Sequence, residues 1–303
     1  MFYYPEGVNK NLEKKFSSID EVKKAIESGE VFESKAILCD KEHNLHFDLG
    51  VIRGIIPKCE GALGIMEGTV KDIALISKVN KMVCFKVVGF HRDDFGELLA
   101  VLSRRQVQIE CKKNYIDKLI PGDIIETKVT HLEKFGAFID IGAGLNSLIP
   151  IDMLSVSRIS HPDQRVYEGQ LIRAVLKKRE DEKLTFSLKE LLGTWQENVN
   201  LFSVGETVTG VVRSIENYGV FVELMPNLAG LAEPCDTLKI GQSVSVFIKS
   251  IIEDKMKIKL VIVSSFNETA PLGELVYFED KKHIDFFKYS PNHAAKTIET
   301  NFA

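Results

Sequence analysis

The chain has 303 residues, of which 45% are hydrophobic and 27% are charged, so it carries enough apolar material for two or three ordinary cores. This composition excludes a disordered chain and a collagen-like repeat. Lys and Arg number 39 against 43 Asp and Glu, and the net charge of -4 excludes the overall positive field of an indiscriminate nucleic-acid binder, so any site for a polyanion has to be local.

No segment is typical of a membrane or secreted protein. No apolar run approaches the roughly 18 residues that cross a bilayer, and Met1–Pro5 lacks the basic-then-apolar order of a signal peptide. We therefore expect a cytoplasmic protein with no membrane partner. The cysteines are odd in number, far apart and never in a C-x-x-C pair, which favours reduced, mostly buried thiols over disulfides or a zinc site; they are Cys39, Cys59, Cys84, Cys111 and Cys235.

Motifs of the common enzyme classes are missing. The sequence has no H-E-x-x-H, no G-x-S-x-G, no phosphate-cradling G-x-x-x-x-G-K and no G-x-G-x-x-G that opens a helix. The acidic runs Glu180–Glu182 and Glu253–Asp254 could bind a metal ion, but they lie where tight turns usually carry solvated acids. We expect no catalytic residue, no metal site and no cofactor, and thus a protein that is not an enzyme.

Residues 1–30 predict an N-terminal segment that contains one helix. Ser18 and Glu21 have the spacing of a capping box, and Gly29 is a typical helix stop. Residues 31–111 then predict a degenerate copy of the domain that follows, because His46–Gly50 and Gly54–Pro57 have the same order as Phe138–Gly142 and Ser147–Pro150.

Residues 118–190 and 203–264 predict two clear copies of one domain. Gly122 and Phe135 have counterparts 83 positions on, in Gly205 and Tyr218. The second copy is shorter, because it lacks a counterpart of the polar segment 152–167, which predicts a loop or short helix. Apolar residues recur at every second position within each copy, which indicates four or five short strands in a small closed or partly open barrel; in the last copy they include Val208, Gly210, Val212, Val220, Val222, Leu224, Val244, Val246, Ile248, Ile258, Leu260 and Ile262.

The remaining segments are a linker and a tail. Residues 191–202 predict a linker helix with Trp195 on its apolar face, where core packing is favoured over stacking on a base. Residues 265–303 predict a tail in which 275–278 and 284–287 form a hairpin around the charged turn 279–282 and pack on a barrel; a second aromatic binding site is the alternative.

Aromatic residues occupy the same outward positions in both clear copies. Alternation predicts Phe138 beside Asp140, and Phe221 beside Glu223, on the outer face of the second strand. Phe135 and Tyr218 lie three positions earlier and would point inward in a regular strand, but the glycines that follow them, Gly136 and Gly219, could support a bulge that turns these rings outward. Stacking on a base contributes roughly 1 to 3 kcal/mol and tolerates any sequence. The alternative is that the rings fill the barrel ends or lie under a neighbouring domain.

Positive residues that could bind phosphates accompany these rings. The last strand of the final copy places Lys255, Lys257 and Lys259 on one face as a basic stripe. Each of these cations taken alone is equally consistent with a solvated outer face. The candidate RNA-binding residues are Phe135, Phe138, Arg158, His161, Lys177, Arg179, Lys183, Tyr218, Phe221, Lys249, Lys255 and Lys257.

The pattern as a whole resembles the S1 RNA-binding domain, the repeat of the large ribosomal protein S1 and of several ribonucleases. It is carried by Phe135–Ile139, Leu148–Pro150, Gly169–Gln170 and Ser187, and again by Tyr218–Val222, Gly230–Leu231 and Gly241–Gln242. The whole chain is similar to the stand-alone three-repeat proteins of clostridia that are similar to bacterial 30S ribosomal protein S1. The resemblance implies an all-β chain of three tandem five-stranded OB-fold barrels, the first degenerate, joined by short helical linkers, with an N-terminal helix and a hairpin-like C-terminal tail.

The resemblance also implies a function. It implies a non-catalytic protein that binds single-stranded RNA, such as mRNA at the ribosome, through the aromatic pair, a histidine on the third strand, and Lys183 and Lys257. Pro150 and Glu233 stand where the family has that histidine, and Glu233 would repel phosphate. In the first copy His43 and His46 stand at the ring positions, so this copy is expected to be architectural or to face the ribosome or another protein. The alternatives are a protein-interaction adaptor and an RNA-decay accessory built on OB folds.

Overall fold

The computed structural model describes residues 3–181, 183–235, 237–269 and 273–302. The chain divides into two compact units: Met1–Leu119 with Asp140–Asn146, and Ile120–Ile139 with Ser147–Ala303. Within the described residues no helix is long and apolar enough to cross a membrane. Of the five cysteines, Cys84 and Cys111 are buried, Cys39 and Cys235 are half-buried and Cys59 is exposed, so the expectation that most are buried was wrong.

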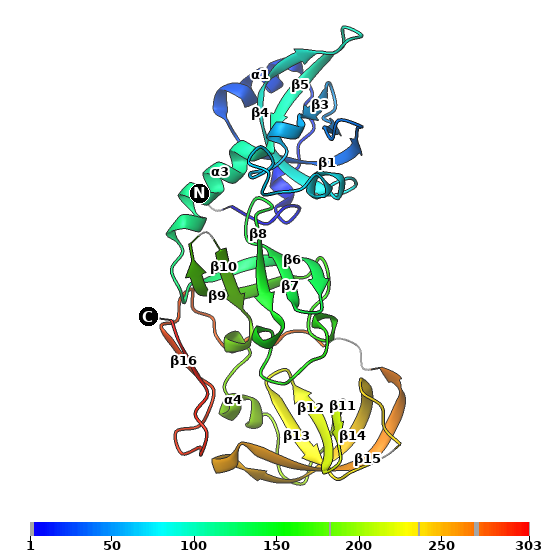
Figure 1. The fold of residues 1–303 in the computed structure, drawn as a ribbon, viewed down its shortest axis with the longest axis vertical. Helices are drawn as coiled ribbons and strands as arrows, with labels where there is room; N and C mark the ends of the chain where they lie inside the picture. The colour runs from blue at the N-terminus through cyan, green and yellow to red at the C-terminus, as the bar shows by residue number, and fades with distance from the viewer. Residues whose placement is uncertain (1–2, 182, 236, 270–272, 303) are drawn as a thin grey trace. The chain divides into compact units, whose positions relative to one another are not determined.

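The described strands form three closed five-stranded barrels, which confirms the all-β fold (Figure 1). In each barrel the third and fifth strands pair in parallel, and the strand order is the same when it is counted from the first strand of that barrel. Barrel 1 consists of β1 (Phe32–Cys39), β2 (Leu45–Asp48), β3 (Arg53–Ile56), β4 (Met82–Arg92) and β5 (Leu98–Ser103); barrel 2 of β6 (Ile124–Glu133), β7 (Gly136–Asp140), β8 (Asn146–Pro150), β9 (Leu171–Glu180) and β10 (Lys183–Ser187); barrel 3 of β11 (Thr207–Glu216), β12 (Gly219–Met225), β13 (Leu228–Ala232), β14 (Gln242–Ile252) and β15 (Lys257–Thr269).

We propose 31–111, 118–190 and 203–264 as the barrel domains, with one extension. β15 continues to Thr269, past residue 264 and into the range expected for the tail. The strand continues because β14 pairs with it as far as Gln242 opposite Thr269.

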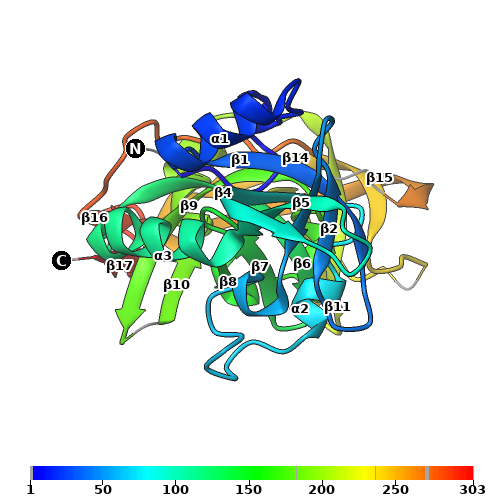
Figure 2. The same ribbon diagram turned by 90° about the horizontal axis from the view of Figure 1, so that it is seen from above.

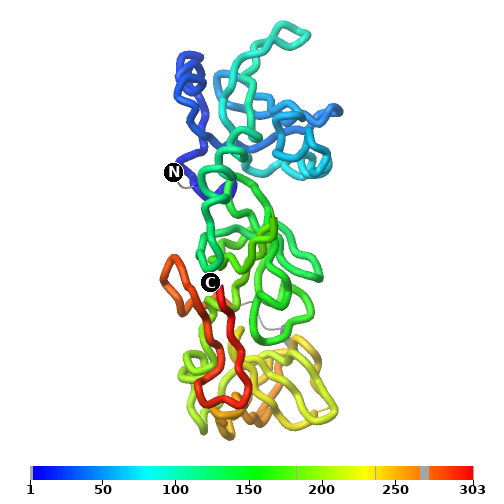
Figure 3. Tube along the Cα trace, turned by 60° about the vertical axis from the view of Figure 1, so that its left-hand side comes forward, coloured from blue at the N-terminus to red at the C-terminus, as the bar shows by residue number. Residues whose placement is uncertain are grey.

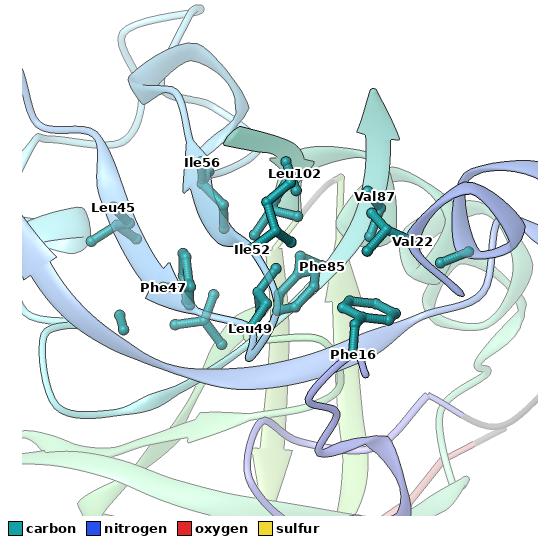
Figure 4. Close-up of a cluster of buried hydrophobic side chains, with 14 residues drawn as sticks. Phe16, Val22, Leu45, Phe47, Leu49, Ile52, Ile56, Phe85, Val87 and Leu102 are labelled. Carbon is teal, nitrogen blue, oxygen red and sulfur yellow. The ribbon is translucent and has the colours of Figure 1, made fainter. Parts of the chain in front are cut away.

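A short helix completes the core of barrel 1. The helix α1 (Ile19–Ser28) begins at Ser18, whose side chain accepts from the Glu21 backbone N–H, and ends at Gly29 with φ 61°, as predicted. The Glu21 carboxylate reaches back to Ser17 instead of Ser18, so the capping box is only half formed. The helix lies over β4 (Figure 2). Val22 and Ala25 belong to the same cluster as the barrel side chains, and Figure 4 shows Val22 together with Phe47, Leu49, Ile56, Phe85 and Leu102.

A second helix, α3 (Arg104–Asn114), follows barrel 1 directly. Ser103 caps it, and Arg104 is buried with its guanidinium on the Glu6 carboxylate. Arg104 and Arg105, the two arginines that directly follow β5, therefore lie in a helix. The remaining short elements are α2 (Ile73–Ile76) and the 3-10 turns η1 (Lys10–Leu12), η2 (Lys58–Glu60), η3 (Ile116–Lys118), η4 (Ile151–Met153), η5 (Pro162–Gln164), η6 (Lys189–Leu191) and η7 (Glu253–Lys255).

The linker between barrels 2 and 3 is less helical than predicted. Gly193, with φ 84°, ends the turn η6, and a capping box formed by Thr194 and Glu197 begins the short helix α4 (Trp195–Val199). The helix expected over residues 191–202 is thus reduced to five residues. Trp195 is 2% exposed in the core cluster of barrel 3, so core packing is confirmed and its stacking on a base is excluded.

The tail forms its hairpin at a different place from the one predicted. The strands are β16 (Phe286–Lys288) and β17 (Glu299–Asn301), and residues 275–278 are not a strand (Figure 3). The earlier residues bond to barrel 2 and to the linker instead: Arg173 N–H donates to Tyr277 Oη at 3.0 Å, and Phe278 N–H donates to Leu191 O at 3.0 Å. Tyr289 and Phe302 are buried in hydrophobic clusters that include barrel residues, and Tyr277 and Phe287 pack against these clusters. The tail thus covers apolar surface of the barrels, as expected.

Candidate nucleic-acid interface

Barrel 3 carries an exposed aromatic pair at the start of β12. Tyr218 precedes the strand and is 66% exposed, whereas Phe221 lies on the outer face and is half-buried. The ring centroids are 6.1 Å apart and the planes meet at 89°, which is an edge-to-face arrangement. Flat apolar surface is therefore open to solvent, and Phe221 lies on the face that alternation predicted.

Barrel 2 repeats this arrangement at the start of β7. Phe135 is 55% exposed, and its ring lies 5.9 Å from the ring of the half-buried Phe138 at an angle of 86°. Because the same geometry recurs on two copies of the fold, the pair is a property of the repeat. The alternative that the rings fill the barrel interior is excluded by their exposure.

Of the two glycines beside these rings, Gly219 does not form the predicted bulge. The register shift in barrel 3 lies in β11 between Val212 and Ser214, while Gly219 pairs regularly with Glu216. A Cβ at Gly136 would lie 2.4 Å from Ile149 O, and one at Gly219 would lie 2.4 Å from Ala232 O. The glycines thus let the backbone of the next strand approach, and Phe135 and Tyr218 point outward because they precede the strand and do not follow its alternation.

His131 is a ring of this surface that sequence reasoning missed. It lies on β6, and its imidazole is stacked on Phe138 with centroids 6.5 Å apart and an interplanar angle of 21°. Alternation from the buried Val129 predicts an inward side chain, yet His131 is exposed. Its counterpart 83 positions on is Ser214, which directly follows the register shift of β11. An irregularity of the same kind in the first strand of barrel 2 is the signal that could have revealed the outward direction of His131.

The imidazole of His131 lies between two carboxylates. Nδ1 is 2.8 Å from Glu168 Oε1 and Nε2 is 3.0 Å from Glu133 Oε1. Hydrogen bonds to Glu133 and Glu168 raise the pKa of His131 above its ordinary value. Barrel 2 therefore has three rings on one outer surface, and one of them, His131, titrates. Two acidic groups lie beside this ring.

Lysines flank the aromatic pair of barrel 3 across the sheet. Phe221 pairs with Leu231, and Leu231 pairs with Lys259, so these three residues form one row over three neighbouring strands. Side chains in such a row share a face, and two strand spacings put Lys259 about 10 Å from Phe221. Lys257 lies one step along the same face and is exposed, whereas Lys255 lies in the turn η7 and not on the strand. Lys249 is exposed on β14.

The cations predicted for barrel 2 are more dispersed. Lys183 is exposed on β10, two residues before Thr185, which pairs with Leu148. Lys177 instead has its ammonium 3.0 Å from Met153 Sδ and lines a cavity of about 260 Å³ together with the tail residues Tyr289 and Thr300. Burial and the neighbouring Lys189 lower the pKa of Lys177.

Three further candidates in barrel 2 have distinct places. Arg179 is half-buried on β9 and Arg158 is exposed in the segment 152–167. His161 caps η5, where its Nδ1 accepts from the Asp163 backbone N–H. His161 is therefore engaged in the local fold.

Two carboxylates predicted to lie beside the rings on the wet face are buried. Glu223 accepts from Arg165 at 2.7 and 3.0 Å and from Arg213 at 2.8 and 3.0 Å. Arg165 comes from the segment 152–167 of barrel 2, which has no counterpart in barrel 3, and its guanidinium holds the Glu223 carboxylate. Asp140, which belongs to the first unit, is 2% exposed and accepts from the backbone N–H groups of Glu6 and Gly142.

Barrel 1 has no aromatic pair at the corresponding place. His43 Nδ1 lies 3.3 Å from Asp72, and His46 Nε2 lies 2.9 Å from Asp40. Histidines held by aspartates offer neither a free ring pair nor an uncompensated positive charge. Glu233, expected to repel phosphate in barrel 3, is exposed.

Comparisons with known proteins show which families and proteins this sequence is similar to. The model described as "S1 RNA binding domain" matches residues 118–189. The small ribosomal subunit protein bS1 of Staphylococcus epidermidis is 34% identical over 180 residues, which cover 54% of this chain and only 46% of that protein. The bS1 of Staphylococcus aureus is 28% identical over 89% of this chain and 71% of its own length, and the bS1 homolog of Bacillus subtilis is 30% identical over 80% and 65%. Residues 118–189 therefore match the S1 RNA binding domain, within a sequence that is similar over most of its length to bacterial ribosomal protein bS1.

Proposed function

We propose that this chain is a non-catalytic cytoplasmic protein that binds single-stranded RNA and works in translation, on mRNA or on the ribosome. The observation that carries the proposal is the pair of edge-to-face rings at the same exposed place on barrels 2 and 3. Lys183 of barrel 2 and Lys257 and Lys259 of barrel 3 supply positive charge for the phosphates. The relatives are ribosomal proteins, small ribosomal subunit protein bS1, and this similarity also supports a role in translation.

Binding of labelled oligonucleotides tests the proposal. We expect single-stranded RNA of about ten nucleotides to fill both barrels, and the affinity to fall steeply as salt increases, because phosphate contacts release counterions. Single-stranded DNA and the two duplexes complete the set. If none of these nucleic acids binds at low salt, the proposal is refuted and the adaptor alternative is favoured.

Removing one ring from each pair tests the surface itself. The variant Phe138→Ala with Phe221→Ala should bind RNA at least about tenfold more weakly, since each stack is worth roughly 1 to 3 kcal/mol. The matched control is Phe95→Ala, because Phe95 is 93% exposed on the connection between β4 and β5 in barrel 1. Equal affinities of the two variants would show that RNA binds elsewhere.

We propose that barrel 1 faces a protein partner, such as a ribosomal protein. It lacks the ring pair, and it exposes apolar side chains on β1 and in the neighbouring turn at Ile37, Leu38 and Val51. Cosedimentation with small ribosomal subunits should be weakened by Ile37→Asp with Leu38→Asp, while affinity for the ten-nucleotide RNA stays unchanged. Loss of RNA binding in this variant would assign barrel 1 to the nucleic acid.

We propose no catalytic step for this chain. Glu253 and Asp254 are exposed in η7, where Asp254 O accepts from the Ala295 N–H of the tail. Asp181 lies in the turn after β9 with φ 51°, and Glu182 lies outside the described residues. RNA incubated with the chain and Mg²⁺ or Mn²⁺ should stay intact, and metal-dependent cleavage would contradict this assignment.

A further inference from the structure

The arrangement around His131 requires a particular protonation state. Each ring nitrogen has a carboxylate oxygen within 3.0 Å, Glu168 at Nδ1 and Glu133 at Nε2. A neutral imidazole has only one N–H and would face one of the two carboxylates with a lone pair. Both contacts are hydrogen bonds only when the ring is an imidazolium.

The same ring belongs to the aromatic surface of barrel 2. Its plane is inclined by only 21° to that of Phe138, and Phe138 in turn meets Phe135 edge to face. The side chain of His131 is 58% exposed, so a base or a phosphate can approach it. The three rings come from β6, from the turn before β7 and from β7 itself.

The charges around this surface decide when it can accept a polyanion. Glu133 comes from β6, as His131 does, Glu168 comes from the loop before β9, and the third neighbour, Phe138, is uncharged. With His131 protonated, these three ionisable groups carry one excess negative charge. With His131 neutral they carry two, beside the rings on which a base would stack, and the repulsion of phosphate increases accordingly.

We infer that His131 is a proton-dependent part of the RNA-binding surface of barrel 2: its imidazolium form completes the Phe135–Phe138 ring surface and neutralises Glu133 and Glu168, and loss of that proton weakens RNA binding. This inference rests on the proposed function and assigns a regulator to the same surface. Hydrogen bonds to Glu133 and Glu168 raise the pKa of His131, so the change occurs above the ordinary pKa of histidine. Because the protonated form binds better, affinity is highest below this pKa and falls as the pH rises through it.

Barrel 3 supplies an internal comparison. Ser214 stands where barrel 2 has His131, and serine does not titrate in this range. The full chain with Tyr218→Ala and Phe221→Ala reports on barrel 2, and the full chain with Phe135→Ala and Phe138→Ala reports on barrel 3. Only the first should bind RNA with a strong dependence on pH.

The experiment measures RNA affinity and the His131 pKa together. A fluorescent RNA of about ten nucleotides is titrated at several pH values between about 5.5 and 8.5, and the His131 ring resonances are followed by NMR with and without RNA, assigned with His131→Gln. By reciprocity of linkage, a rise of half a pKa unit in the complex corresponds to about a threefold loss of affinity across the titration. We expect at least that change for barrel 2, and none for barrel 3.

Variants separate the ring from its charge. His131→Phe keeps a ring and should bind at all pH values with the weak affinity that the unchanged chain shows at high pH. Glu133→Gln with Glu168→Gln should bind more tightly, because two negative charges are gone. Its fall in affinity should move to lower pH, because these carboxylates no longer raise the pKa of His131. The controls are His91→Gln, an exposed histidine of β4, and Glu126→Gln, an exposed glutamate of β6; both should behave as the unchanged chain does.

The outcomes distinguish this inference from the function on which it rests. RNA binding by barrel 2 with an affinity independent of pH, or a His131 pKa that does not rise on binding, would overturn the role of His131 and leave the proposed function in place. Failure to bind RNA at every pH would overturn both.

Discussion

At the scale of single residues, two glycines allow the ring pairs to exist. A side chain at Gly136 or Gly219 would enter the space of the neighbouring carbonyl oxygen, at 2.4 Å in both cases. The next strand could not keep its place, and the turn that aims Phe135 or Tyr218 outward would have to move. Glycine at these positions is therefore required by the space for the backbone, in the same way in both barrels.

This requirement predicts the effect of adding a methyl group. Gly136→Ala or Gly219→Ala should lower the free energy of unfolding by about 2 to 3 kcal/mol, as expected for a backbone clash in a packed sheet. The measurement is urea unfolding. Gly89→Ala is the matched control, because Gly89 is also in a strand and has open space at its Cβ position; similar losses for the control and the two variants would contradict the steric argument.

Sequence reasoning reached some of these residues and not others. The outward aim of Phe138 and Phe221 follows from alternation, which is a local property. His131 is exposed against the alternation of β6, and the burial of Glu223 depends on Arg165, 58 residues earlier in the chain. The spacing of nearby residues in the sequence predicts neither result, because the side chains depend on neighbouring strands and on a segment from another barrel.

At the scale of elements, the segment 152–167 joins barrel 2 to barrel 3. Arg165 and Arg213 hold Glu223 in a buried triad, and Val156 N–H donates to Asn227 Oδ1 at 2.9 Å. Sequence comparison of the two copies identified the segment as extra and predicted a loop or short helix. The turns η4 and η5 agree with that prediction. Only the structure shows that the segment bonds to barrel 3.

The triad predicts a large cost for removing its central charge. Glu223→Gln leaves two guanidinium groups without a counter-charge in a buried place and should destabilise the second unit by about 3 kcal/mol. Urea unfolding followed by the fluorescence of Trp195, the single tryptophan, reports on this unit. Glu216→Gln, an exposed position at the end of β11, is the control and should change little.

The same triad predicts how stability depends on acid. Burial by itself raises the pKa of Glu223, but hydrogen bonds from Arg165 and Arg213 outweigh it and hold the pKa below its ordinary value. The stabilisation is thus complete above the unfolded-state pKa of about 4.3 and is lost as the pH falls through the lower folded-state pKa. The difference in stability between the unchanged chain and Glu223→Gln should shrink on acidification, and a difference that grew would contradict the assignment.

At the scale of the whole second unit, the tail ties together parts that are distant in sequence. The Arg173 guanidinium lies 5.6 Å from the Tyr277 ring and donates to Glu279 O and Lys281 O, while Asp123 lies 2.7 Å from His283 Nδ1. Tyr289 Oη donates to Asn227 O at 2.5 Å. The sequence predicted a hairpin around the turn 279–282 that packs on a barrel. Packing on the barrels is observed, but the hairpin forms later, between β16 and β17.

Tyr289 should be the main anchor of the tail on barrel 3. Its ring is buried in the barrel cluster, so Tyr289→Ala should destabilise the unit by about 3 kcal/mol through the cavity and the lost hydrogen bond. Phe286→Ala removes a ring of the same hairpin that is 52% exposed and should cost under about 0.5 kcal/mol. Trp195 fluorescence during urea unfolding measures both, and equal effects would show that the tail is only loosely attached.

The order of the chain gives this tail a consequence during synthesis. Arg173 and Tyr277 are 104 residues apart, and Asp123 and His283 are 160 apart, so barrel 2 is synthesised well before the tail residues that bind it. At roughly 5 to 20 residues per second, the delay is about 5 to 30 s. Throughout that interval Ile124 and Val175 of barrel 2 lack Ile284 and Phe302, the tail residues that bury them, and offer a chaperone apolar surface to bind.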